Sequence, residues 1–213
     1  RAFYCLANLK SVTLNSNIIS IPDYCFYGCE SLTDVNLENI LNYGSSCFER
    51  TLIETVQPNS KATFADATFC HMPKLRSVVL PDGITTLTEA MFSICPSLTS
   101  IVIPSSVTTF KKSVFYNCNN LVVTIPDTVT TLGASSLNGT KMVYCTSNSA
   151  CAKYCEENGV KYKLTDVAPP NANDFEVTLS EDSFVYSGYE EKPENVTVYY
   201  NCLLYTSDAA DDK

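Results

Sequence analysis

The sequence predicts a repeat solenoid: a mostly β, right-handed coil of short parallel strands that ends in a helical cap. Three observations support this fold class. An aromatic residue recurs at intervals of 21–23 residues, most intervals contain the same apolar strand pattern, and a short amphipathic segment follows the last interval. The recurring positions are Phe3, Phe26, Phe48, Phe69, Phe92 and Phe115, and Leu137 continues the series.

A second set of spacings predicts the strand of each coil. A leucine follows most of the phenylalanines by six residues, and in four repeats a β-branched residue and then Leu or Ile come three and five residues later. This L-x-x-V-x-L pattern is the strand signature of a leucine-rich repeat coil. Its apolar members point inward, because side chains alternate along a strand. They are Leu9, Leu32, Leu75, Leu98 and Leu121; Val12, Val35, Val78 and Ile101; and Leu14, Leu37, Leu80 and Ile103.

One coil cannot bury its own inner face, so the coils are expected to stack with parallel strands about 4.8 Å apart. We expect the chain to return to the next phenylalanine through a short helical or 3₁₀ turn. The third repeat, residues 48–58, keeps Ile53 and Val56 but is one residue short. A local distortion is expected there, without a break, because Phe69 resumes the register. In three coils a proline turns the chain after the strand, and an apolar pair follows before the chain returns to the next phenylalanine. The prolines are Pro81, Pro104 and Pro126, and the pairs are Ile84/Leu87, Val107/Phe110 and Val129/Leu132.

Two stretches resemble the BspA-type leucine-rich repeat: residues 92–107 (FSICPSLTSIVIPSSV) and residues 26–35 (FYGCESLTDV). The resemblance covers residues 1–164, about three quarters of the chain. Proteins of this family are typically secreted or surface-attached in bacteria, with some in mucosal protozoa, and are associated with adhesion and host-protein binding. The resemblance therefore implies an extracellular or cell-surface location.

Residues 149–159 predict the helix that closes the array. Asn148 or Ser149 can cap its start, and Gly159 suits the left-handed position just past its end. Residues 160–164 predict a final strand, so about six repeats and a cap at 142–164 form a domain spanning residues 1–164. The helix places Cys151, Tyr154 and Cys155 on one face and Lys153, Glu156 and Glu157 on the other.

Three further segments are expected after the cap. Residues 165–174 predict a proline-containing extended linker. Residues 175–201 resemble the truncated start of an immunoglobulin-like module, with strands at 175–179, 184–188 and 196–200, because a complete sandwich needs roughly 100 residues. Residues 202–213 break the strand pattern and resemble a translated sequencing adapter, so we interpret them as a non-native tail. The chain opens at Arg1 in the middle of a repeat, and we expect the natural chain to begin upstream.

The net charge of −9 comes from the C-terminal segments. Residues 1–165 carry 12 Lys/Arg and 12 Asp/Glu, whereas residues 166–213 carry 2 and 11. The repeats therefore have no basic stripe for a phosphate backbone, and nucleic acid is not an expected partner. No apolar run approaches about eighteen residues, so no membrane insertion of this fragment is expected.

The cysteines follow the repeat register. Cys29, Cys95 and Cys118 lie three residues after a repeat phenylalanine, and Cys25 and Cys47 lie just before one. Buried free thiols, which pack as small hydrophobes, fit this spacing best. A disulfide between neighbouring coils, at Cys95 and Cys118, is the alternative, because stacked Cα atoms lie about 5 Å apart.

Groups for catalysis are scarce. Cys145, Cys151 and Cys155 are the sharpest metal candidates, but zinc prefers four ligands, often in C-x₂-C pairs, and packing beneath the cap explains them better. His71, the single histidine, adjoins Cys70. Adjacent side chains on an extended chain point apart, so a Cys/His nucleophile pair is not expected. We therefore predict no enzyme, no cofactor, and no catalytic or metal-binding residue.

The residue between the two inward strand positions is expected to face solvent, and in these repeats it is small and uncharged. An extended strand surface suits proteins or glycans better than small molecules. One interpretation of the two valines is a partner site centred on Val79 and Val102. The other, which we favour, is that β-branched residues simply prefer strands. The column is Thr13, Asn36, Gln57, Val79, Val102 and Thr124.

Two functions fit these patterns. The first is a non-enzymatic surface or secreted module that adheres to extracellular proteins or glycans of a host or neighbouring cell. The alternative is a stiff spacer that presents another domain from the cell surface.

Overall fold

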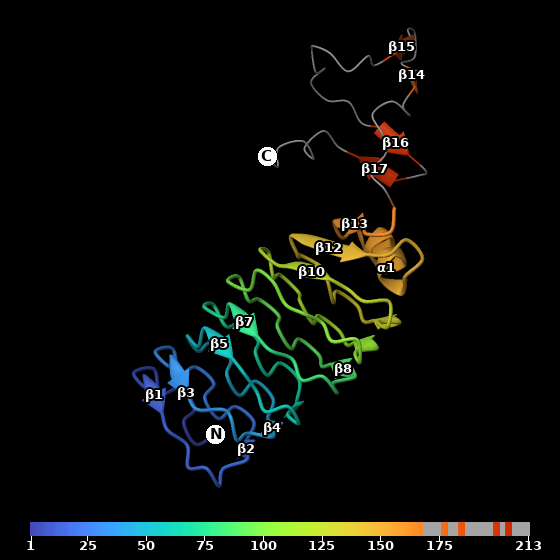
Figure 1. Cartoon of the computed structure of the whole chain (residues 1–213). Coiled ribbons are helices and arrows are strands. Elements are labelled where there is room, and N and C mark those ends of the chain that lie inside the picture. The colour runs from blue at the N-terminus through green and yellow to red at the C-terminus, as the bar shows by residue number, and fades with distance from the viewer. Residues whose placement is uncertain (168–175, 179–182, 186–197, 201–202, 206–213) are drawn as a thin grey trace. The chain divides into compact units, whose positions relative to one another are not determined.

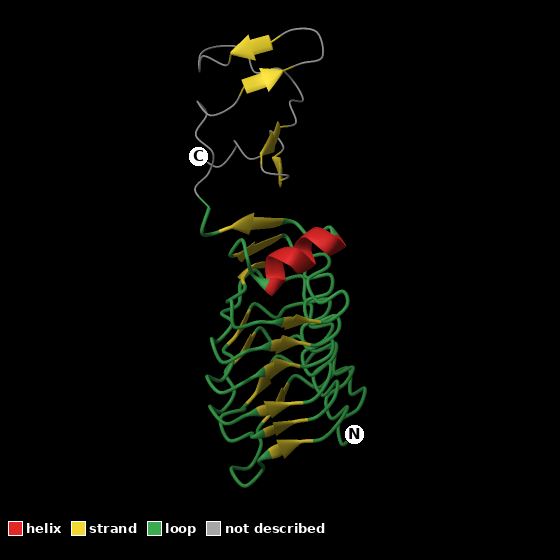
Figure 2. Cartoon of the chain, turned by 90° about the vertical axis from the view of Figure 1, so that its right-hand side faces the viewer, coloured by secondary structure: helices red, strands yellow, loops and turns green. Residues whose placement is uncertain are grey.

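The computed structural model describes residues 1–167, 176–178, 183–185, 198–200 and 203–205 (Figure 1). The chain divides into two compact units, Arg1–Val167 and Ala168–Lys213, which are described separately. The first unit is a solenoid of about seven turns with parallel strands and a single short helix near its C-terminal end (Figures 1 and 2). The predicted fold class is confirmed.

The L-x-x-V-x-L pattern forms the first of two strand ladders. Its strands pair in parallel as β1 with β3, β5 with β7, β10 with β12, and β12 with β13, and a bridge joins Ser100 to Val122. In each of β3, β5 and β7 the valine is buried and the residue before it is exposed. The strands are β1 (Ser11–Val12), β3 (Asp34–Val35), β5 (Thr55–Val56), β7 (Ser77–Val78), β10 (Val122–Thr124), β12 (Met142–Cys145) and β13 (Tyr162–Leu164).

A second ladder, which was not predicted from the sequence, forms at the apolar pairs, and β8, β9 and β11 each end at the second member of a pair. Strand β4 pairs with β2 and β6, and β9 pairs with β8 and β11, all in parallel. Each strand has only two residues, too few for a visible alternation of apolar and polar side chains. The strands are β2 (Ser20–Ile21), β4 (Asn42–Tyr43), β6 (Thr63–Phe64), β8 (Thr86–Leu87), β9 (Thr109–Phe110) and β11 (Thr131–Leu132).

The return to the phenylalanine is a series of turns, so the predicted helical or 3₁₀ segment is wrong. Two residues in this return have left-handed backbone, two positions before and two after the phenylalanine; in the second coil they are Tyr24 (φ 57°) and Gly28 (φ 69°). The N–H groups of Tyr24, Phe26 and Gly28 each donate to a carbonyl of the next coil at 2.9 Å. A helix would direct these N–H groups along its own axis, whereas the left-handed residues direct alternate N–H groups at the neighbouring coil.

The phenylalanines form one continuous column inside the solenoid. Successive rings from Phe3 to Phe115 are stacked, with centroids 5.2–6.2 Å apart and planes within 6–14° of parallel. The widest step, 6.2 Å, joins Phe48 to Phe69, and the N–H of Phe48 lies 3.4 Å from the carbonyl of Thr68, whereas the same bond from the other column phenylalanines measures 2.8–3.0 Å. The distortion predicted for the third repeat is therefore confirmed, and the column continues through it.

The cap forms as the sequence indicates. Helix α1 (Ala150–Asn158) begins after Ser149, whose hydroxyl accepts from the N–H of Ala152 at 3.1 Å, and Gly159 follows it with φ 63°. The predicted apolar face is buried, and α1 lies across one end of the stack of coils (Figure 2). The final strand, β13, begins at Tyr162, two residues later than predicted.

The second unit contains two antiparallel strand pairs, β14 (Glu176–Thr178) with β15 (Ser183–Val185) and β16 (Val198–Tyr200) with β17 (Leu203–Tyr205). The first three lie within or beside the predicted strands. Strand β17 lies in the segment that was predicted to break the strand pattern. The immunoglobulin-like module and the non-native origin of residues 202–213 stay predictions. Residues 168–174 of the predicted linker lie outside the described residues.

Candidate binding face and metal-ligand cluster

The outward column of the first ladder is a neutral face with an apolar centre. Val79 and Val102, at adjacent coils, are 56% and 83% exposed, while the residues flanking each of them are buried. Thr13, Gln57 and Thr124 are also exposed. Beside strands β5 and β7, Arg76 Nε lies 3.5 Å from Glu54 Oε2, so these two charges are paired with each other.

Asn36 differs from the rest of this column because its side chain is half-buried. Its amide oxygen accepts from the N–H of Leu14 at 2.6 Å, and its amide nitrogen donates to the carbonyl of Leu14 at 3.0 Å. The side chain therefore ties the first coil to the second and has little capacity left for a partner.

The Cys29, Cys95 and Cys118 thiols have a repeated structural role. Each donates to the carbonyl of the phenylalanine in the preceding coil, at 2.9, 3.1 and 2.9 Å. All three are buried, and burial raises the pKa of each thiol, that of Cys118 to about 11. The ten cysteines in the described part of the chain are free. These thiols are therefore small hydrogen-bonding core groups with little nucleophilic character.

The cap cysteines are buried, Cys151 and Cys155 on α1 and Cys145 at the end of β12. The Sγ atoms of Cys151 and Cys155 lie 3.9 Å apart. The hydrogen bond between the Cys145 and Cys151 side chains lowers the pKa of Cys145 and raises that of Cys151. The hydrogen bond between Cys151 and Cys155 raises the pKa of Cys151 further. Among the described residues these three do not converge as metal ligands; the one group whose ligand atoms all lie within 4.8 Å of one another is Glu49, Cys70 and His71.

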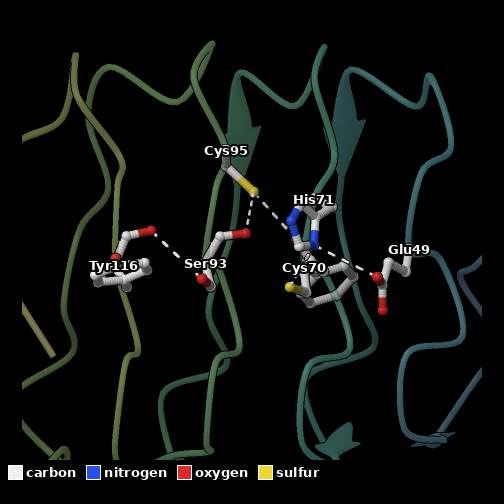
Figure 3. A network of polar contacts seen from close by, with 7 residues as sticks. Glu49, Cys70, His71, Ser93, Cys95 and Tyr116 are labelled. Atoms are coloured by element: carbon white, nitrogen blue, oxygen red, sulfur yellow. Dashed lines mark hydrogen bonds and ion pairs between the residues drawn. The ribbon is translucent and has the colours of Figure 1, made fainter. Parts of the chain in front are cut away.

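The side chains of Cys70 and His71 meet, contrary to the expectation that they point apart (Figure 3). Cys70 Sγ lies 3.2 Å from His71 Nδ1, and Glu49 Oε1 lies 3.4 Å from the same nitrogen. The cause is the backbone of His71, whose φ of 51° is left-handed and not extended. The N–H of His71 donates to the carbonyl of Ser93 in the next coil at 2.8 Å, which holds this conformation.

The repeat register brings Glu49 to the same place. Glu49 and Cys70 each follow a repeat phenylalanine by one residue, so they are neighbours across two stacked coils. Burial, followed by the charge of Glu49, raises the pKa of Cys70 to about 12, while the Ser93 hydroxyl acts in the opposite direction. A nucleophile pair would need the thiol and the carboxylate on different ring nitrogens, and here both approach Nδ1.

The model of the BspA type leucine rich repeat region, in 6 copies, matches residues 1–122 and 95–172. The chain belongs to this family. No curated protein sequence matches it. In this BspA-type chain, no helix among the described residues has the length and apolarity needed to cross a membrane.

Two solved structures share the fold. A leucine-rich repeat protein from Bacteroides ovatus ATCC 8483 is similar with a TM-score of 0.59 and 20% identity, over 68% of this chain and 45% of that one. A leucine rich cell surface protein from Faecalibacterium prausnitzii A2-165 is similar with a TM-score of 0.55 and 23% identity, over 64% of this chain and 39% of that one. This chain therefore spans less than half the length of either protein.

Proposed function

We propose that this BspA-type chain is a non-enzymatic interaction module of a cell-surface or secreted protein, and that a protein or glycan partner docks on the strand face around Val79 and Val102. The observation that carries the proposal is the 83% exposure of Val102 between two buried isoleucines. Burial of apolar surface drives most associations, and a β-branched side chain has few rotamers to lose when it is covered.

Two further observations support a binding role over catalysis. The described residues include one histidine, and its neighbouring thiol is buried with a pKa raised to about 12. The surface location is supported by family membership and by the cell-surface description of the Faecalibacterium relative.

The test must separate a partner site from simple strand preference. Full burial of a valine is worth about 1.5–3 kcal/mol, so a partner that covers both valines should bind Val79→Asp/Val102→Asp at least about tenfold more weakly. The matched variant Val79→Thr/Val102→Thr keeps the β-branched shape and removes much of the apolar surface. A control pair, Thr85→Asp/Thr108→Asp, places the same charges on exposed positions just before strands β8 and β9 of the second ladder.

Binding of the full chain to purified extracellular-matrix proteins and mucins would be measured by biolayer interferometry, with circular dichroism to confirm folding. We expect saturable binding that both valine variants weaken and the control pair leaves intact. Saturable binding that survives both folded valine variants would place the site elsewhere. No saturable binding to any member of the panel would favour the spacer function, which the continuous phenylalanine column supports.

A further inference from the structure

The Glu49, Cys70 and His71 side chains form a mixed set of a carboxylate, a thiol and an imidazole (Figure 3). Their side chains are 17% exposed for Glu49 and 44% for His71, and the Cys70 residue is 6% exposed. The set is therefore anchored in the core on the Cys70 side and open to solvent on the His71 side. Zinc takes this combination of ligands, in tetrahedral sites of four ligands or of three protein ligands and a water.

Two of the three separations between ligand atoms are close to those expected around a tetrahedral ion. Zinc bonds of about 2.3 Å to sulfur and about 2.0–2.2 Å to nitrogen and oxygen separate S from N by about 3.6 Å and N from O by about 3.4 Å. The observed separations are 3.2 Å from Cys70 Sγ to His71 Nδ1 and 3.4 Å from His71 Nδ1 to Glu49 Oε1. A shift of a few tenths of an ångström at the sulfur brings the Sγ–Nδ1 separation to that value, and all three ligand atoms lie within 4.8 Å of one another.

We propose that Glu49, Cys70 and His71 bind one zinc ion, or a similar divalent transition metal, with the fourth position open to water. The Cys70 proton leaves to solvent when the metal binds, because the thiolate is the ligand. The ion offsets the negative charges of Glu49 and the thiolate, which repel each other without it.

The position of the site suggests what the ion does. Glu49 belongs to the coil of Phe48, and the other two ligands belong to the coil of Phe69. The contact between these coils is the loosest in the column, with 6.2 Å between ring centroids and 3.4 Å from the N–H of Phe48 to the carbonyl of Thr68. A bound ion would clamp the short third repeat to its neighbour.

The test uses the full, reduced chain, freed of metal and titrated with Co²⁺. Thiolate ligation gives a charge-transfer band in the near ultraviolet, and four-coordinate cobalt gives intense visible bands. We expect both at one equivalent, with displacement by Zn²⁺. Because removal of even an outer partner costs about 10–100-fold in affinity, Cys70→Ser should abolish the charge-transfer band, and Glu49→Gln should weaken binding at least tenfold.

His71→Asn is included as a ligand variant that should fold normally, because the His71 side chain is exposed and Asn tolerates left-handed backbone. It should weaken Co²⁺ binding at least tenfold and remove the Zn²⁺-dependent rise in unfolding temperature. The controls are Cys5→Ser, an exposed thiol, and Cys151→Ser, in the cap; both should keep the bands. Bands that persist in Cys70→Ser, or disappear in Cys151→Ser, would overturn the assignment. Weak visible bands without charge transfer would show adventitious carboxylate binding only and would also overturn it.

Discussion

Truncation of a single ring in the middle of the phenylalanine column tests whether the solenoid has one continuous core. Phe92 is fully buried and stacks on Phe69 at 5.6 Å and on Phe115 at 5.5 Å. Phe92→Ala removes the ring, leaves a cavity and ends both stacking contacts. Buried Phe→Ala changes cost about 3–5 kcal/mol, and each aromatic pair is worth about 0.5–1.5 kcal/mol beyond its area. We expect a loss in the upper half of that range.

Two comparison variants calibrate this value. Phe3 is half-buried and has one stacking neighbour, Phe26 at 5.2 Å, so Phe3→Ala should cost about 1–2 kcal/mol. Phe92→Leu installs the residue that Leu137 provides in the last repeat, which keeps most of the volume and loses the stacking. Its expected cost is about 1–3 kcal/mol.

The assay is urea unfolding followed by far-ultraviolet circular dichroism, because the chain has no tryptophan. The free energy of unfolding and its denaturant dependence, m, are both needed, since a repeat array can lose cooperativity between its halves. Equal costs for Phe92→Ala and Phe3→Ala, with m unchanged, would refute the continuous column. A reduced m for Phe92→Ala alone would instead show that the halves uncouple at this ring, as nearest-neighbour coupling allows.

Three further changes have expected outcomes. Ala90→Gly should stabilise the chain by about 0.5 kcal/mol, because Ala90 has left-handed backbone (φ 53°), which costs a non-glycine residue about 1–2 kcal/mol. The control, Ala62→Gly, lies at a buried position where φ is not positive and should destabilise the chain. The two changes in the free energy of unfolding, measured in urea, must therefore have opposite signs. Ser149→Ala should cost about 1 kcal/mol by removing the cap of α1, and amide hydrogen exchange should rise in residues 150–158 before it rises in the coils. Stability should fall as pH rises above about 9, because the Cys118 thiol keeps its proton up to a pKa of about 11 when the chain is folded and loses it at lower pH when the chain is unfolded. By pH 10 this one group costs about 1.4 kcal/mol, and Cys118→Ala should show a correspondingly shallower decline.

The features that could be predicted from sequence depend on local rules or on periodicity. The phenylalanine column follows from spacing alone, because each coil must present its apolar face to the next. The cap follows from the chemistry of Ser149 and Gly159, which satisfy the ends of α1. The distortion at the third repeat follows from one missing residue between Phe48 and Phe69.

The second ladder and the return turns could not be predicted in the same way. Pairs such as Thr86–Leu87 are too short for an alternating pattern, and their pairing is decided by stacking. The return turns depend on left-handed backbone, for which glycine is the usual signal. Most coils place other residues there, including the β-branched Ile94 at φ 56°, and the hydrogen bond from its N–H to the next coil helps to offset the strain.

The same feature explains why the Glu49, Cys70 and His71 cluster was missed. Register alone brings Glu49 and Cys70 together, since both follow a phenylalanine by one residue. The orientation of His71 depends on the sign of φ two residues after the phenylalanine, where His71 shares a column with the matching residues of the other coils. With Gly28, Asn117 and Gly139 in that column, the residue types already favour left-handed backbone. Aligning the coils outward from the phenylalanine therefore predicts left-handed backbone at His71. Such backbone turns the His71 side chain back over Cys70, because a left-handed residue reverses the side-chain direction that an extended strand would impose.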